Sequence, residues 1–159
     1  MAILAVSALL IVANGTPLVL SNLLGQRANW RIDGGVTLAD GRALFGATKT
    51  WRGLAGSLIA TTLLAILLGL GWQVGLLVAA GAMVGDLLSS FSKRRLGFAS
   101  SARAPGLDQL PEALLPALGL YFFFSYPLWL VLIATLLFVA VDVGLSPLLF
   151  RWGLRRVPH

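Results

Sequence analysis

The hydrophobic residues of this chain are concentrated in long blocks that contain almost no charge, and this constrains its fold more than any other feature. Hydrophobic residues make up 58% of the 159 residues and charged residues only 11%. A soluble domain has about a quarter of its residues charged. The blocks neither alternate with period two nor follow one helical face, which is typical of segments that cross a bilayer. We therefore predict an all-α, polytopic integral membrane protein with a single transmembrane domain, residues 1–159.

Five blocks are predicted to form transmembrane helices: about 2–24, 53–71, 74–91, 112–124 and 128–150. The fourth block is shorter than the roughly 20 residues that a span needs, so it must begin inside the preceding loop or lie in a thin region. The first block lacks the basic start of a cleaved signal peptide. It contains Asn14 and Pro17, and proline removes a backbone donor. We expect a kinked or broken first helix whose Asn14 faces protein rather than lipid.

The basic residues fall on one side of this five-span arrangement. They lie in the first loop, the third loop and the C-terminal segment, which hold, in order, Arg27, Arg31, Arg42, Lys49 and Arg52; Lys93, Arg94, Arg95 and Arg103; and Arg151, Arg155 and Arg156. By the positive-inside rule this side is cytoplasmic, so the N-terminus is predicted to be outside and the C-terminus cytoplasmic, in the cell (inner) membrane. The net charge of +6 then indicates contact with membrane lipids and anionic substrates rather than nucleic acid.

Cysteine is absent and histidine occurs once, which narrows the kinds of catalytic and metal site that are possible. The chain has no cysteine, so disulfides, thiolate metal ligands and cysteine nucleophiles are excluded. Its single histidine is the last residue, His159, which argues against histidine-based catalysis and metal binding. A metal would therefore be held by oxygen ligands, which favours Mg²⁺ or a similar hard cation.

The third block contains Asp86 close to its cytoplasmic end, and charge inside an apolar segment is costly and usually functional. On a helix Ser90 and Lys93 follow at i+4 and i+7, so the three share one face. The structural alternative is that Asp86 is neutralised by Lys93 or an arginine. The small residues Gly75, Ala79, Gly81 and Gly85 of the same block are predicted to allow close helix packing.

A second carboxylate, Asp108, follows one loop later. Two carboxylates near the same face of the bilayer could share a divalent cation, although Asp108 is also a plausible N-cap of the fourth helix.

Residues 48–53 begin the second span with cations and hydroxyls, which suits either an anion site at a helix N-terminus or a membrane anchor. The Walker A spacing is absent. Asp142, inside the fifth block, is predicted to be a structural hydrogen-bond partner.

These motifs resemble a known family. Gly85-Asp86-Leu-x-x-Ser90-x-x-Lys93-Arg94, with Asp108-Gln109-Leu110 downstream, resembles the CTP-dependent cytidylyltransferases that make CDP-activated lipids. Asn14-x-x-Pro17, Lys49-Thr50-Trp51-Arg52-Gly53 and Pro-x-x-Asp108-Gln109 are similar to the narrower CDP-archaeol synthase family, whose members are short and have five spans.

The resemblance implies a nucleotidyltransferase that moves CMP from CTP to a membrane lipid phosphate similar to archaetidic acid (di-O-geranylgeranylglyceryl phosphate). The products would be a CDP-lipid and pyrophosphate. It implies Asp86, Lys93 and Asp108 as catalytic residues, with Mg²⁺ held through Asp86 and Asp108. It also implies a larger set of residues that bind CTP and the lipid phosphate: Asn14, Thr48, Lys49, Thr50, Arg52, Ser90, Lys93, Arg94 and Gln109.

The chain departs from these relatives at two places. The His-Gly-Gly and Asp-Arg-x-Asp motifs of the CDP-diacylglycerol branch are absent. The archaeal branch usually reads Asp-Gln-Leu-Asp, whereas Pro111 stands at the last position here and Glu112 follows it. Glu112 could supply the missing carboxylate, or the metal site has one ligand fewer.

Three alternatives remain open at this stage. They are synthesis of CDP-diacylglycerol from phosphatidic acid, a transporter whose path is lined by Asn14 and Asp142, and a non-catalytic lipid-binding protein.

Overall fold

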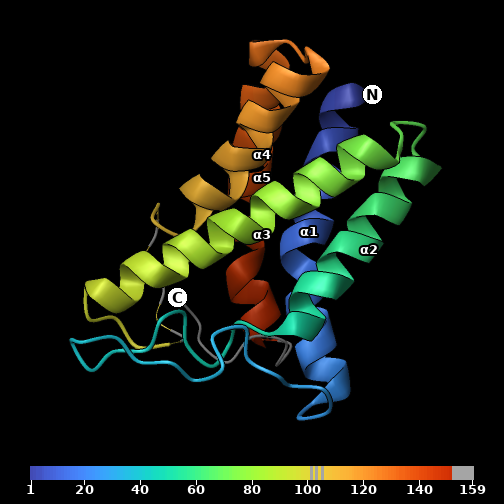
Figure 1. Ribbon diagram of the computed structural model, residues 1–159. Helices are drawn as coiled ribbons and strands as arrows, with labels where there is room; N and C mark the ends of the chain where they lie inside the picture. The colour runs from blue at the N-terminus through green and yellow to red at the C-terminus, as the bar shows by residue number, and fades with distance from the viewer. Residues whose placement is uncertain (101, 103, 105, 152–159) are drawn as a thin grey trace.

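The computed structural model describes residues 1–100, 102, 104 and 106–151 of the chain, and the described part contains five helices and no strand (Figure 1). The helices are α1 (Ala2–Leu24), α2 (Trp51–Leu67), α3 (Trp72–Arg95), α4 (Gln109–Phe124) and α5 (Leu128–Arg151). The predicted all-α class and order of elements are confirmed. Some predicted boundaries are wrong, since α3 continues four residues beyond Phe91 and α4 already begins at Gln109.

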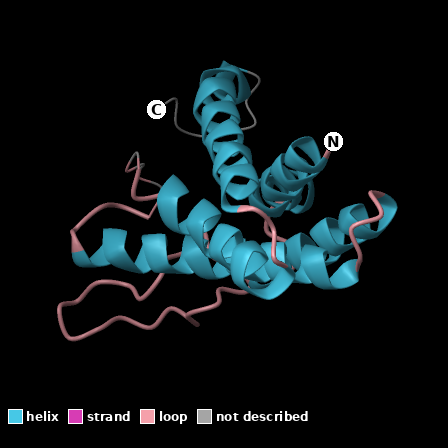
Figure 2. Ribbon diagram, turned by 90° about the horizontal axis from the view of Figure 1, so that it is seen from above, coloured by secondary structure: helices cyan, strands magenta, loops and turns pink. Residues whose placement is uncertain are grey.

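Within the described residues, α1 and α3 are long and apolar enough to cross a membrane. Helix α2 and residues 128–144 of α5 are shorter apolar segments. Figure 2 shows that the helices gather into one bundle while the long loops project at one side.

The sequence predicted a kinked or broken first helix. No break occurs at Pro17, because α1 is continuous from Ala2 to Leu24. Proline at position 17 removes the amide that would bond to the carbonyl of Ala13. The hydroxyl of Ser57 on α2 donates to that carbonyl instead, at 2.8 Å. The backbone group left without a partner is thus satisfied from the neighbouring helix, which keeps α1 intact within an apolar bundle.

Small residues let α3 lie directly against its neighbours, as predicted. A Cβ atom at Gly75 would fall 2.6 Å from the Cβ of Ala65 on α2. A Cβ at Gly81 would fall 2.9 Å from the backbone nitrogen of Pro116 on α4, and one at Gly85 would fall 2.6 Å from that of Glu112. The α3–α4 contact at Gly85 therefore brings the first turn of α4 next to Asp86.

The first loop, residues 25–50, is folded around the buried carboxylate of Asp33, whose residue is only 6% exposed. This carboxylate accepts hydrogen bonds from the backbone N–H groups of Gly35 (2.9 Å), Phe45 (3.1 Å) and Gly46 (2.9 Å). Burial alone would raise the pKa of Asp33, but these three N–H groups and the charge of Arg31 together lower it. Because the pKa is lowered on folding, the stabilisation from Asp33 is present above the ordinary aspartate pKa. It is lost as pH falls through the lowered value.

The same loop is fastened to the C-terminal end of α3. The Arg42 side chain donates to the carbonyl oxygen of Arg95 at 2.5 Å, where a helix end leaves acceptors unpaired. In return, Arg95 donates to the carboxylate of Asp40 at 2.6 Å and to the carbonyl of Ala43 at 2.7 Å. The Asp33 carboxylate is buried, whereas the Asp40–Arg95 pair is more exposed.

Replacing Gly85 by alanine tests the close α3–α4 contact. The added methyl group would collide with backbone atoms of Pro111 and Glu112, so we expect Gly85→Ala to lower the unfolding free energy by about 1–3 kcal/mol. The measurement is the thermal unfolding midpoint of the detergent-purified protein. Gly15→Ala is the matched control, because Gly15 is also helical and has no atom within 4 Å of the added methyl. Equal midpoints for the two variants would contradict the contact.

Replacing Asp33 by asparagine tests the fold of the first loop. Losing the charge-assisted bonds is expected to cost about 1.5–3 kcal/mol, which corresponds to roughly tenfold or more in the opening equilibrium of the loop. Trypsin should then cleave within residues 25–50 roughly tenfold faster at low protease concentration. Asp40→Asn in the same loop removes a more exposed carboxylate and is expected to have a smaller effect. A cleavage rate that Asp33→Asn leaves unchanged would refute this role.

Candidate active site

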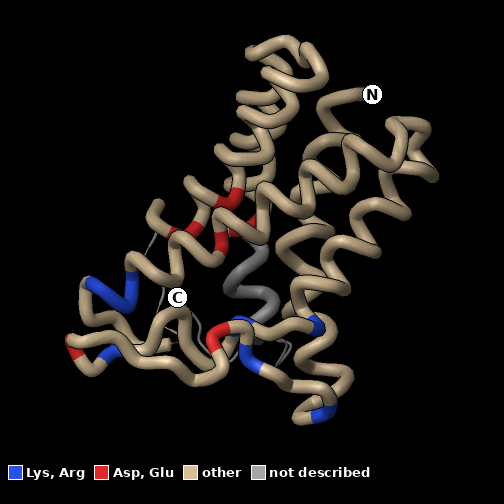
Figure 3. The backbone as a smooth tube through the Cα atoms, viewed as in Figure 1, with Lys and Arg blue, Asp and Glu red and all other residues tan. Residues whose placement is uncertain are grey.

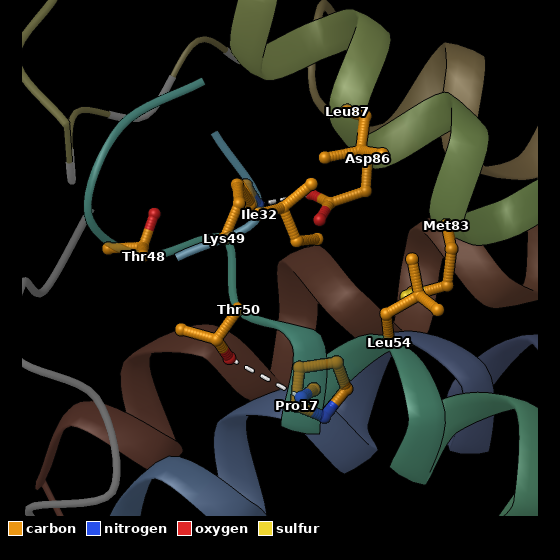
Figure 4. Close-up of a pocket in the computed structure, with 10 residues that line it drawn as sticks. Pro17, Ile32, Thr48, Lys49, Thr50, Leu54, Met83, Asp86 and Leu87 are labelled. Carbon is orange, nitrogen blue, oxygen red and sulfur yellow. Dashed lines mark hydrogen bonds and ion pairs between the residues drawn. The ribbon is translucent and has the colours of Figure 1, made fainter. Parts of the chain in front are cut away.

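A pocket opens between α1, the first loop, α2 and α3 and encloses about 340 Å³, part of it open to solvent (Figure 4). Its apolar lining consists of Pro17, Ile32, Leu54, Met83 and Leu87. Its polar lining consists of the side chains of Thr48, Lys49, Thr50 and Asp86. A pocket lined by both polar and apolar side chains suits an amphipathic ligand.

An ion pair between Lys49 and Asp86 lines the pocket, with 2.5 Å between Lys49 Nζ and Asp86 Oδ1 (Figure 4). The two side chains are only 20% and 21% exposed. Two hydrogen bonds hold the backbone of Lys49. Its carbonyl oxygen accepts from the N–H of Ile32 at 2.9 Å, and its N–H donates to the carbonyl oxygen of Gly46 at 3.3 Å. The loop folded by Asp33 thus presents Lys49 to α3.

A second ion pair joins Lys93 of α3 to Asp108 in the next loop, with 2.6 Å between Lys93 Nζ and Asp108 Oδ1. Lys93 also donates to the carbonyl of Ala102 at 3.1 Å, and Asp108 Oδ2 accepts from the N–H of Ala104 at 3.0 Å. The partner expected for Asp86 in the structural alternative is wrong, because Asp86 pairs with Lys49 and Lys93 pairs with Asp108. Asp108 does occupy the N-cap position of α4, as the other alternative had it, but its side chain makes no cap bond.

Glu112 on the first turn of α4 lies next to these pairs. Its partly buried side chain is within hydrogen-bonding reach of Asp86 and also close to Asp108 and Lys49. Gly85 makes this approach possible, because its missing side chain leaves room for Pro111 and Glu112. Figure 3 shows acidic residues in the middle of the molecule and the basic residues of the described segments toward the end that carries the long loops.

Several residues predicted from the sequence do lie at these pairs. Thr48 and Thr50 line the pocket, and the Thr50 hydroxyl caps α2 by accepting from the N–H of Gly53 at 3.3 Å. Arg94 is buried, donates to the carbonyl of Ala99 at 2.7 Å and interacts electrostatically with Asp108. Ser90 is buried on the same helix, at 2% exposure.

Three predicted binding residues are engaged elsewhere. The Asn14 amide donates to the carbonyl of Leu10 in its own helix at 3.0 Å. Arg52 donates to the carbonyl of Arg27 at the protein surface and does not line the pocket. Both polar ends of the Gln109 carboxamide are used within the protein, by Gly106 and Asp142. The last contact agrees with the predicted structural role of Asp142.

The sequence reasoning missed the residues that shape the first loop, namely Asp33, Asp40 and Arg42. A local signal for Asp33 was present, because Asp-Gly-Gly is typical of a turn in which the aspartate accepts from the backbone two residues on. The Asp33–Gly35 bond has this form. The longer-range bonds to Phe45 and Gly46 left no local pattern.

Chemically, the arrangement places two ammonium groups and three carboxylates in a partly buried region near the pocket. Ammonium groups neutralise phosphates, and carboxylate oxygens are the ligands that hard divalent cations prefer. In the described part of the chain, no three acidic or histidine side chains are already grouped closely enough to hold a metal ion. Each of Asp86 and Asp108 has a lysine as its present partner.

Comparison with known proteins identifies the family. The chain matches the model of the CarS-like CDP-archaeol synthase family over residues 2–72 and 69–159. It is 41% identical to the CDP-archaeol synthase of Pyrococcus furiosus over 61% of this chain and 60% of that protein. It is 36% identical to that of Pyrococcus horikoshii over 89% of this chain and 81% of that protein.

A solved structure is also similar. It is described as an intramembrane enzyme for archaeal membrane lipids biosynthesis, and it matches with a TM-score of 0.60 and 31% identity over 84% of this chain and 90% of that one. This likeness supports a membrane protein. Since the family model covers the described helices and the polar loops between them, the chain belongs to the CarS-like CDP-archaeol synthase family.

Proposed function

We propose that this protein is a CTP-dependent cytidylyltransferase that transfers CMP to an archaetidic-acid-type lipid phosphate in the membrane and releases pyrophosphate. Membership of the family supports the reaction, and the chain spans 60% of the length of the P. furiosus relative. The observation that carries the proposal is the Lys49–Asp86 pair at a pocket that is also lined by apolar side chains. A lipid phosphate likewise combines a charged group with an apolar remainder.

In the proposed reaction, an oxygen of the lipid phosphate forms a bond to the α-phosphorus of CTP. The bond from that phosphorus to the oxygen bridging the β-phosphate breaks, and pyrophosphate leaves with the electron pair. Such a transfer requires positioning and charge neutralisation rather than a covalent enzyme intermediate. Lys49 and Lys93 would bind and orient the phosphates, and Arg94 would add positive charge near Asp108. Thr48 at the pocket offers a hydroxyl donor.

Asp86 and Asp108 would hold Mg²⁺, with Glu112 as a third oxygen donor beside them. The donor type fits a hard cation, which prefers carboxylate oxygens. In the described residues these side chains are not yet grouped as a metal site, so the carboxylates would have to move closer together on binding. When bound, the metal would neutralise negative charge on the triphosphate. We expect an exchange of partners when the substrates bind. Lys49 and Lys93 would then pair with the phosphates, and the aspartates that they leave would bind the cation.

We also propose the membrane topology of five spans with the N-terminus outside and the C-terminus and active site facing the cytoplasm. The positive-inside rule supports it. In Figure 3 the described lysines and arginines lie toward the end of the molecule that carries the two long loops, away from the N-terminus. CTP in the cytoplasm would then reach the site from the loop side, and the lipid phosphate from the bilayer.

The activity prediction uses membranes that contain the full chain, labelled CTP, Mg²⁺ and either archaetidic-type or diacyl phosphatidic acid. We expect the wild type to form a CDP-lipid with the ether lipid preferred. Asp86→Asn and Lys49→Met should each lose about 100-fold or more in rate, because they remove charge placed at the reacting phosphates. Asp40→Asn removes a carboxylate outside the pocket and serves as the control. Full activity of Asp86→Asn would refute its role.

The metal prediction is read from stability rather than activity. A ligand that binds only the folded state stabilises it by mass action, so Mg²⁺ at about 100 times its dissociation constant should add about 2.7 kcal/mol. We expect Mg²⁺ to raise the unfolding midpoint of the wild type in detergent and EDTA to reverse this. The Asp86→Asn/Asp108→Asn double variant should show no such shift. A shift that persists in the double variant would place the metal elsewhere.

A further inference from the structure

Asp142 is an ionisable residue inside an apolar helix, and the proposed reaction does not use it. Intramembrane carboxylates are costly and are retained where they have a role. Along α5, Leu130, Ala134 and Phe138 are buried and repeat every four residues, and Asp142 is the next member of that stripe. Asp142 is thus on the face of α5 that packs against the bundle, one turn beyond Phe138.

The contact that Asp142 makes there leads to the candidate site. Its Oδ2 atom accepts a hydrogen bond from Gln109 Nε2 at 3.3 Å. The other end of the same carboxamide, Gln109 Oε1, accepts from the backbone N–H of Gly106 at 2.9 Å. Because a carboxamide is planar and both ends are engaged, Asp142 fixes the orientation in which Gln109 holds Gly106.

The turn held in this way carries Asp108. Gly106 has a φ of 83°, a left-handed conformation that glycine adopts without strain. Two residues on, Asp108 pairs with Lys93 at 2.6 Å and accepts from Ala104 at 3.0 Å. The chain of contacts therefore runs from α5 through the first residue of α4 to the carboxylate that faces α3.

We propose that Asp142 is a positioning residue of the active site, which acts through the Gln109 carboxamide to hold the turn that presents Asp108 to Lys93. The inference rests on the proposed function for its catalytic consequence, but the positioning itself concerns this chain alone. What Asp142 supplies is a hydrogen-bond acceptor in the right place. Asparagine keeps a carbonyl oxygen there, and leucine does not.

The test is a double-variant cycle on the full-length protein, with Asp142→Leu, Gln109→Leu and their combination. We expect each single change to lower kcat/KM for CTP by about tenfold to 100-fold, as outer partners of functional groups typically do. The combination should be no worse than either one, because both break the same connection. Asp142→Asn should retain most of the wild-type activity. Multiplicative losses, or Asp142→Asn as defective as Asp142→Leu, would overturn the proposal.

A second readout does not depend on the reaction. The chain has no cysteine, so Leu107→Cys introduces a single thiol next to Asp108. Its labelling by a water-soluble maleimide should speed up several-fold when Asp142→Leu or Gln109→Leu is added, and stay unchanged with Asp142→Asn. Phe138→Leu, on the same stripe of α5, is the control for general loss of packing. Unchanged labelling in Asp142→Leu would overturn the proposal even if the enzymatic activity fell. If the wild type lacked the proposed activity, labelling would still decide.

Discussion

The structure depends on two ion pairs that join one helix to two separate loops. Lys49 of the first loop pairs with Asp86, and Asp108 of the later loop pairs with Lys93. All four side chains are at most 21% exposed. Charges in such positions are strongly unfavourable without a partner, so both loops must stay docked on α3. The same two ion pairs therefore hold the polar loops in place and position the charged side chains of the candidate site.

There is a geometric reason why Asp86 and Lys93 pair with loop residues rather than with each other. Asp86 and Lys93 are seven residues apart on α3, about 10 Å along a helix with a rise of 1.5 Å per residue, which is too far for a direct pair without large side-chain bending. Each therefore takes a partner of opposite charge from outside the helix. As a result, one helix face presents an acidic and a basic group to two different loops, and the partly buried region beside them collects both kinds of charge.

The sequence was sufficient for the class of fold and for the identity of the paired residues on α3. The apolar blocks predicted the five helices, and Asp86, Lys93 and Asp108 were recognised because charge near a membrane segment needs an explanation. What it could not predict was partner choice, since Lys49 and Asp86 are 37 residues apart and only the packed loop brings them together. The sequence predicted a kink or a break at Pro17, and the break is absent because Ser57, on another helix, satisfies the free carbonyl of Ala13. Arg52 and Asn14 were assigned to the site from their motifs; in this structure each side chain donates to a nearby carbonyl, and their binding role stays a prediction.

Three residues outside the two ion pairs support the candidate site, each from a different element. Asp33 orders the loop that carries Lys49, Gly85 allows α4 to bring Glu112 to Asp86, and Gln109 ties the Asp108 turn to α5. None of these residues has to touch a substrate to matter. Transfer of a nucleotidyl group depends on holding several like-charged phosphates in register, and small errors in position are costly when little covalent chemistry is supplied by the protein. In the proposed reaction, the chain would meet that demand with supports from different elements, among them the backbone bonds of Asp33 in the first loop and the Gln109 carboxamide at the start of α4.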